Sequence, residues 1–311
     1  MAQNNAAAAA GRKPKKPKQS HTSGMSRALV RRETTSAYLF LLPSLVFFVL
    51  FVVIPMFICV FYSLFDYSLG GINAFVGLDN YIRLFQDPVF HKGFINTVII
   101  VVVAVPTVTA FSLWVASAIY KMNAFARSFF RCVFYLPVVT GSVAITVVWK
   151  WILDPYNGIL NMLLGTDGYN WLGEGKTALA CIIVILFTTS IGQPIVLYVA
   201  ALGNVDNSII EAAQVDGATN FQVFWRVIWP SIMPTTLYVL VITTINSFQC
   251  FALIQLMTSG GPQNATMTIM YQVYYSAYRL FDLGYANAIG VVLAIIIAIF
   301  SALQFKLAKT D

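Results

Sequence analysis

Six long apolar segments constrain the fold of this chain more than any other feature. A helix of about 20 residues is needed to cross roughly 30 Å of hydrocarbon, and each segment is close to that length. The composition agrees, because 59% of the 311 residues are hydrophobic and only 10% are charged, unlike a soluble domain of this size. The sequence therefore predicts an all-α, polytopic membrane protein with six transmembrane helices. We place them at residues 38–62, 94–119, 129–151, 178–202, 232–257 and 283–305.

Residues 1–36 differ from the rest of the chain in being basic and of low complexity. They contain an alanine run, then GRKPKKPK, then Ser, Thr and Gly with scattered arginines. This segment has too little apolar surface to offset the entropy of ordering, so we predict a disordered basic cytoplasmic tail. A signal peptide is disfavoured, because the following apolar run is longer than an h-region and lacks a small-residue cleavage site. Residues 37–311 would then form one transmembrane domain.

The basic residues predict the orientation of the spans. With both termini in the cytoplasm, 14 of the 19 basic residues lie on the cytoplasmic side, in agreement with the positive-inside rule. The remaining five lie outside: Arg83, Lys92, Lys150, Lys176 and Arg279. The net charge of +7 is thus explained by membrane topology and lipid headgroups, which disfavours nucleic acid as a partner.

Several function classes are excluded by what the predicted spans lack. They contain no Asp, Glu or His, whereas a proton-coupled carrier needs such a group as a relay. No motif brings an acid, a base and a nucleophile together, and there is no Walker A sequence, so we expect neither an enzyme nor an ATPase. The four cysteines lie in apolar runs without CxxC spacing, which predicts no metal site.

The stretch EAAQVDGATNFQVFWRVIWPSIMP, residues 211–234, predicts two short helices joined at a glycine. Gly217 adopts positive φ at no steric cost, so it can end the first helix and turn the chain into the second. Apolar spans lie on both sides, so we place this elbow at a membrane surface as a docking element. It falls on the cytoplasmic side, after the fourth span.

This stretch resembles the EAA loop of the inner-membrane permease subunits of ATP-binding-cassette importers. The matching residues are Glu211, Ala212, Ala213, Asp216, Gly217, Ala218 and Pro230. Gly260-Gly261-Pro262 followed by Thr266 resembles the carbohydrate-type permeases. Residues 77–81 (GLDNY) and Asn96-Thr97 are similar to the maltose-F-like subunit of that group.

The resemblance implies a set of partners and a mechanism. It implies a type I importer permease fold, a companion permease, two cytoplasmic ATPase subunits whose clefts accept the EAA loop, and an external sugar-binding protein. The chain itself would bind no cofactor, because ATP would be used by the partner ATPase. A prokaryotic inner or plasma membrane is the implied location. Closure of the ATPase dimer would drive alternating access through the loop.

Neutral polar residues interrupt the fourth and fifth predicted spans and form a candidate substrate pathway. In the fourth span these include Thr188, Gly192 and Gln193. In the fifth, the spacing i, i+3, i+4, i+7 predicts one shared helical face, formed by Thr243, Asn246, Ser247 and Cys250. Uncharged donors and acceptors with neighbouring phenylalanines suit sugar hydroxyls and the apolar faces of pyranose rings. The alternative is hydrogen bonding between helices, which small polar residues often provide in membranes.

The sequence therefore predicts a non-catalytic permease subunit of a binding-protein-dependent importer for a carbohydrate. A glycerophosphodiester or a polyol is the alternative substrate within the same class. A phosphate-bearing substrate would favour a basic pathway, which the interior of the predicted spans lacks, because their only basic residues, Arg131 and Lys150, lie near the ends of the third span. A stand-alone channel or carrier is the alternative from another class.

Overall fold

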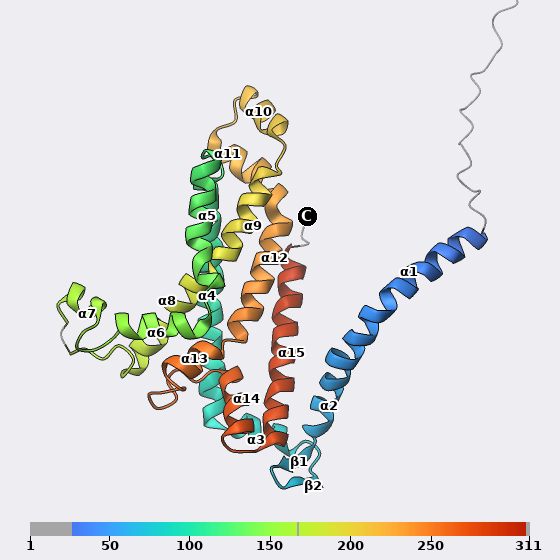
Figure 1. The fold of residues 1–311 in the computed structure, drawn as a ribbon, viewed down its shortest axis with the longest axis vertical. Coiled ribbons are helices and arrows are strands. Elements are labelled where there is room, and N and C mark those ends of the chain that lie inside the picture. Colours follow the sequence, from blue (N-terminus) through green and yellow to red (C-terminus); the bar gives the residue numbers. More distant parts are fainter. Residues whose placement is uncertain (1–26, 167, 309–311) are drawn as a thin grey trace, which may run out of the picture. The chain divides into compact units, whose positions relative to one another are not determined.

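The computed structural model describes residues 27–166 and 168–308, and these residues are predominantly helical (Figure 1). The chain divides into two compact units, residues 1–56 and 57–311. The predicted tail falls largely on residues 1–26, which lie outside the described residues.

The first predicted span is helical throughout. It consists of α1 (Arg27–Phe48), the π-helical turn Val49–Val53 and α2 (Ile54–Tyr62). Helix α1 begins inside the segment predicted as a tail, so residues 27–36 are helical in the structure. The stretch Ser36–Tyr62 is long and apolar enough to cross a membrane.

The second unit is a bundle of helices with one small hairpin. The two strands of the hairpin, β1 (Phe65–Ser68) and β2 (Gly71–Phe75), pair antiparallel. The helices are α3 (Asp79–Gln86), α4 (Pro88–Ile119), α5 (Ala124–Val139), α6 (Ser142–Ile152), α7 (Ile159–Leu164), α8 (Gly175–Ser190), α9 (Gly192–Gly203), α10 (Asn207–Val215), α11 (Asn220–Val223), α12 (Trp229–Phe248), α13 (Ala252–Met257), α14 (Ile269–Tyr278) and α15 (Leu283–Ala308).

The prediction of six spans is confirmed when each of two bent helix pairs is counted as one span. Within the described residues, four helical stretches are long and apolar enough to cross a membrane. The bent pairs are α5 with α6 and α8 with α9. Helix α4 is the central element, because it packs against α8, α9, α12 and α14 and carries the longest series of buried residues.

The third span, predicted over residues 129–151, consists of two helices that meet at a sharp corner. Helices α5 and α6 meet at 97°, because Thr140 and Gly141 have extended ψ angles of 127° and 143°. Pro137, one turn earlier, also removes a backbone donor. Figure 1 shows α6 and α7 projecting sideways from the bundle.

The fourth span bends by 41° between α8 and α9. Pro194 contributes to the bend, because it cannot donate to the carbonyl of Ser190. Gly192 lies against the backbone of α5, where an added Cβ would come within 2.4 Å of the carbonyl oxygen of Phe134. The break therefore brings α9 into close backbone contact with α5.

The fifth span starts earlier and ends earlier than predicted. A continuous helical stretch runs over Asn220–Phe248, so the second helix of the predicted elbow is the first part of this span rather than a separate short helix. The span ends at Phe248, and residues 249–251 separate it from α13, which corrects the predicted range 232–257.

Two π-helical turns precede prolines at the same spacing. In the turn Val49–Val53, the N–H of Ile54 bonds to the carbonyl of Val49, and Pro55 follows. In the turn Phe224–Ile228, the N–H of Trp229 bonds to the carbonyl of Phe224, and Pro230 follows. A proline ring clashes with the carbonyl four residues earlier, so a widened turn at that carbonyl relieves the clash.

The end of the bundle formed by β1, β2 and α3 is held by polar contacts. Arg83 and Asp282 form an ion pair of 2.6 Å. Asp87 accepts hydrogen bonds from the hydroxyl of Tyr285 at 2.6 Å and from the side-chain amide of Gln272 at 2.9 Å. These contacts join α3 and the start of α4 to α14 and α15. Helices α10 and α11 lie at the opposite end of the bundle (Figure 1).

Candidate functional site

The elbow between α10 and α11 has the geometry that the sequence predicted for Gly217. This glycine has a φ of +81°. Its N–H donates to the carbonyl of Gln214 at 3.0 Å, and the N–H of Ala218 donates to the carbonyl of Ala213 at 3.0 Å. This pair of bonds is the Schellman arrangement that ends a helix at a left-handed residue. No atom lies within 4 Å of an added Cβ at Gly217, so only its backbone angle favours glycine.

Both helices of the elbow are capped by their own side chains. The carboxylate of Asp206 accepts from the N–H of Ser208 at 2.8 Å at the start of α10, and this bond lowers the pKa of Asp206. At the start of α11, Thr219 and Gln222 form a capping box. The shape of the elbow is therefore specified locally by three polar side chains and one glycine.

One side of the elbow packs on the bundle, and the other side is exposed. Ala213 and Ala218 are half-buried against the apolar cluster that includes Val223. Glu211, Ala212 and Asp216 are exposed, as are the apolar side chains of Val215 and Phe221.

Glu211 lies outside the one ion pair, Arg83–Asp282, formed among the described residues. Its carboxylate therefore has no cationic partner within the part of the chain that the structure describes. Pro230 lies away from the elbow, in the first turn of α12.

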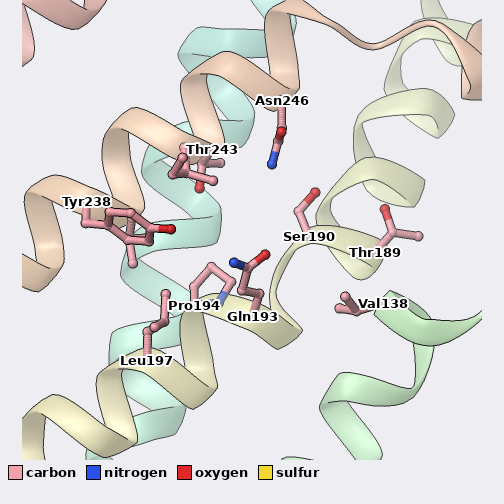
Figure 2. Close-up of a pocket in the computed structure, with 11 residues that line it drawn as sticks. Val138, Thr189, Ser190, Gln193, Pro194, Leu197, Tyr238, Thr243 and Asn246 are labelled. Atoms are coloured by element: carbon pink, nitrogen blue, oxygen red, sulfur yellow. The ribbon is translucent and has the colours of Figure 1, made fainter. Parts of the chain in front are cut away.

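A polar cavity of about 150 Å³ lies between α12, the break between α8 and α9, and the end of α5. Figure 2 shows side chains from α12 facing those of Ser190 and Gln193 across this space. The cavity is lined by Val138, Thr189, Ser190, Gln193, Pro194, Leu197, Tyr238, Val239, Ile242, Thr243 and Asn246. The lining contains amides and hydroxyls but no charged side chain, so it can bind neutral polar groups.

The structure brings together only part of the predicted pathway. Gln193, Thr243 and Asn246 line the polar cavity, whereas Ser247 is buried and does not line it. The hydroxyl of Thr188 donates to the carbonyl of Ile185 at 2.8 Å, within its own helix.

Two further predicted pathway residues have different surroundings from those expected. Gly192 provides the close contact with α5 described above. The prediction that Cys250 shares a helical face with Thr243 is wrong, because α12 ends at Phe248, before Cys250. It lines a second cavity, of about 360 Å³, together with Thr140, Thr189, Gln249 and Phe251 among others.

Tyr238 and Val138 line the polar cavity but were not predicted as site residues. A signal for Tyr238 was present, because Tyr238, Ile242 and Asn246 recur at i, i+4 and i+8 on α12. Val138 has no comparable signal, because it lies at the cavity through the packing of α5 against α9.

The polar cavity shares lining residues with a cavity on each side. It shares Val138 and Thr189 with the second cavity. It shares Gln193 and Leu197 with a third cavity, of about 500 Å³ between α5 and α9. Arg131 lines this third cavity and is the charged residue among the linings of the three. The three cavities follow α5 along most of its length.

Two sequence motifs meet at the loop between α13 and α14. The side-chain amide of Asn96 donates to the carbonyls of Ala265 and Met267 at 3.0 and 2.9 Å. The hydroxyl of Thr266 donates to the carbonyl of Gly261 at 2.7 Å. The Asn96-Thr97 motif on α4 therefore anchors the loop that carries Gly260-Gly261-Pro262.

Comparison with known proteins identifies the family. Residues 33–309 match the family described as binding-protein-dependent transport system inner membrane component. The chain belongs to this family. It is therefore a non-catalytic permease subunit of an ATP-binding-cassette importer, as the sequence predicted, and not a stand-alone channel or carrier.

Individual relatives cover nearly the whole permease subunit. The probable ABC transporter permease protein YurN of Bacillus subtilis is 35% identical over 91% of this chain and 99% of its own length. The probable starch degradation products transport system permease protein AmyD of Thermoanaerobacterium thermosulfurigenes is 31% identical, over 88% of this chain and 93% of its own length.

A solved structure shares the permease fold. It is a bacterial ABC transporter involved in the import of the acidic polysaccharide alginate, with a TM-score of 0.78 and 22% identity. The match covers 90% of this chain and 98% of that chain. The predicted type I importer fold is thereby confirmed.

Proposed function

We propose that this permease subunit conducts a neutral carbohydrate through the polar cavity between α12 and the α8–α9 break. The observation that carries the proposal is the lining of that cavity, which combines the amides of Gln193 and Asn246 and the hydroxyls of Ser190 and Thr243 with the ring of Tyr238. Neutral hydroxyls of a sugar match such donors and acceptors, and the apolar face of a sugar ring matches an aromatic side chain. The starch-product system to which AmyD belongs supports the same substrate class.

We propose two kinds of role for the residues of the predicted pathway. Gln193, Thr243 and Asn246 would contact the sugar in the polar cavity, and Cys250 would border the adjoining cavity. Thr188, Gly192 and Ser247 would support the helices that form the walls, because their contacts lie within or between helices.

The elbow at Gly217 would dock on the ATPase and couple its ATP-driven movement to the permease. Its exposed side, with Glu211, Val215 and Phe221, would fit a cleft in one partner ATPase subunit. Ala213 and Ala218 would transmit movement to the bundle they pack on. The partners would be a companion permease, two ATPase subunits and an external sugar-binding protein. The ATPase subunits would bind the ATP, with both termini of this chain in the cytoplasm.

A glycerophosphodiester is the second candidate substrate, and Arg131 favours it. The guanidinium group lines the third cavity, which shares Gln193 with the polar cavity, so an anionic group there would have a cationic partner. This observation revises the expectation of a pathway without basic residues. The polar cavity itself has an uncharged lining, which favours the neutral sugar.

Uptake in cells that lack this chain tests the proposal. Radiolabelled maltose, lactose, N,N′-diacetylchitobiose and glycerophosphocholine would be compared in cells with and without the chain, with its ATPase and binding protein present. We expect uptake of at least one neutral saccharide to depend on the chain, and glycerophosphocholine uptake not to depend on it. Dependence of glycerophosphocholine uptake alone would instead support the second candidate.

A further inference from the structure

A row of aromatic rings leads from the surface of α14 to the second cavity. Tyr271, Tyr274, Tyr275 and Tyr278 recur on α14 at i, i+3, i+4 and i+7, so they share one helical face. The ring centroids of Tyr278 and Tyr274 are 5.3 Å apart, and those of Tyr274 and Phe251 are 4.8 Å apart. We call Tyr278, Tyr274 and Phe251 the aromatic row.

Exposure decreases along the aromatic row toward the cavity. The side chain of Tyr278 is 67% exposed, whereas Tyr274 and Phe251 are half-buried. Phe251 lines the second cavity with the polar side chains of Thr189 and Gln249. Because Thr189 also lines the polar cavity, the row ends where the proposed sugar pathway begins.

A buried tyrosine and a glycine hold the aromatic row in place. Tyr271 is almost fully buried, and its ring centroid lies 6.3 Å from that of Phe251 and 6.1 Å from that of Tyr274. Gly260 packs directly on Tyr271, since an added Cβ would come within 2.8 Å of the ring. The Gly260-Gly261-Pro262 motif therefore leaves room for the ring on which the row rests.

We infer that the aromatic row is a binding track for the sugar rings of a saccharide on their way to the polar cavity. This inference rests on the proposed function. A sugar ring presents an apolar C–H face that stacks on an aromatic ring, while the tyrosine hydroxyl binds sugar hydroxyls at its edge. Tyr274 and Tyr278 lie about one helical turn apart on α14, so they offer successive contacts to a chain of sugar units.

The alternative role for surface tyrosines is an aromatic belt at the membrane interface. A belt faces lipid along the outside of a protein. The aromatic row instead turns inward from Tyr278 and ends at a cavity whose mixed lining includes the polar side chains of Thr189 and Gln249, which is the geometry of a route for a ligand.

The binding track can be tested in a transport assay that measures both the sugar imported and the ATP hydrolysed. The permease complex would be reconstituted in proteoliposomes with its companion, its ATPase and the sugar-binding protein. Radiolabelled maltotriose, cellotriose and triacetylchitotriose would serve as probes. If the track does not hold a sugar after the binding protein has released it, the sugar escapes to the outside. The number of saccharides imported per ATP hydrolysed therefore measures how well the track holds the sugar.

The variants are Tyr274→Leu and Tyr278→Leu, with Tyr274→Phe and Tyr278→Phe to retain the rings. Tyr156→Leu is the matched control, because Tyr156 is 86% exposed and lies outside the row. We expect the leucine variants to import about two- to tenfold fewer saccharides per ATP, with unchanged stimulation of ATP hydrolysis by the binding protein. The phenylalanine variants and Tyr156→Leu would retain at least half of the wild-type ratio.

An unchanged import ratio in both leucine variants would overturn the track, as would an equal loss in Tyr156→Leu. Reduced membrane abundance with an unchanged ratio would assign the tyrosines to an aromatic belt. If the wild-type complex hydrolyses ATP but imports no saccharide, the proposed function fails together with the track. If the wild-type complex imports a probe and the leucine variants match it, only the track fails.

Discussion

The hydroxyl of Thr268 donates a hydrogen bond of 3.1 Å to the carbonyl oxygen of Cys250, which ties the start of α14 to the break between α12 and α13. The same hydroxyl accepts from the N–H of Tyr271 at 3.2 Å and so caps α14. Thr268 is fully buried. One hydroxyl thus satisfies a carbonyl freed by the end of one helix and an N–H freed by the start of another.

Replacing this hydroxyl is expected to destabilise the permease. Thr268→Val keeps the shape but leaves the carbonyl of Cys250 without its donor, at a cost of about 1–3 kcal/mol. Thr268→Ser keeps the hydroxyl and serves as the control. Thermal unfolding of the purified permease in detergent measures the difference, and equal melting temperatures for the two variants would contradict the role of this bond.

The predicted orientation can be tested with single cysteines in the elbow and in the segment between α6 and α7. After replacement of the four native cysteines, we expect a cysteine at Asn220 to react with an impermeant thiol reagent only in inside-out vesicles. A cysteine at Asn157 is expected to react from outside in intact cells. Both positions are exposed. Labelling of both from the same side would exclude the six-span topology.

Glu211→Lys is expected to uncouple the permease from its ATPase. The carboxylate is exposed and lies outside the ion pair formed among the described residues, so it is available to a basic group of the ATPase. Leaving one charge of a desolvated pair without its partner costs on the order of 3–5 kcal/mol. Co-purification of the ATPase and uptake both measure the loss, and Gln214→Lys on the same helix controls for added charge. Normal co-purification together with normal uptake would show that Glu211 is not part of the docking surface.

Gly217 is expected to tolerate alanine better than valine. Space around the position is open, so the cost arises from positive φ, at about 1–3 kcal/mol, and it rises for a β-branched residue. Gly217→Val should lower uptake per ATP hydrolysed more than Gly217→Ala does. Gly203→Ala, also in open space but without positive φ, is the control. Equal, wild-type transport in both Gly217 variants would show that the left-handed conformation is dispensable.

Alanine substitutions at Asn246 and Ser247 are expected to have different effects, on sugar affinity and on membrane abundance respectively, although the two residues are adjacent. Asn246 lines the polar cavity, so Asn246→Ala should cost about 0.5–1.5 kcal/mol of sugar binding, which is a few-fold to tenfold in half-saturating concentration. Ser247 is buried outside that lining, so Ser247→Ala should change abundance more than affinity. Uptake against sugar concentration, corrected for the amount of permease, separates the two. Thr236→Ala is the control, because its hydroxyl donates to Ile232 within its own helix. Reduced abundance of Asn246→Ala with unchanged affinity would assign this residue to helix packing.

The sequence was sufficient to predict features with local causes. Hydrophobic length identified the spans, and the conformational freedom of glycine identified the turn at Gly217, whose φ is +81°. Features with distant causes were not predictable. Helix α12 ends at Phe248 without a glycine or proline to mark the end. The carbonyl of Cys250, just beyond the helix, accepts a hydrogen bond from the hydroxyl of Thr268, 18 residues later.

The polar cavity was partly predictable for the same reason. Thr243 and Asn246 were found because helical spacing is local, and Cys250 was assigned to the wrong face because the helix ends before it. Val138 lies at the cavity because α5 packs against α9, a helix far away in the sequence. No periodicity in the chain reports such a contact.

The π-helical turn Phe224–Ile228 lets the chain hold one extra residue between the elbow and α12 with little change in the direction of the elbow. A π turn holds one residue more than the α-helix it interrupts. Deleting one residue from this turn would therefore restore regular α-helix with both flanking segments close to their original orientation. Deleting one residue from the regular helix of α12 would instead rotate the elbow about the helix axis by about 100°, the angle of one residue in an α-helix. Glu211 would then point away from its original direction with its sequence context unaltered, so motif matching alone would not detect the loss of coupling.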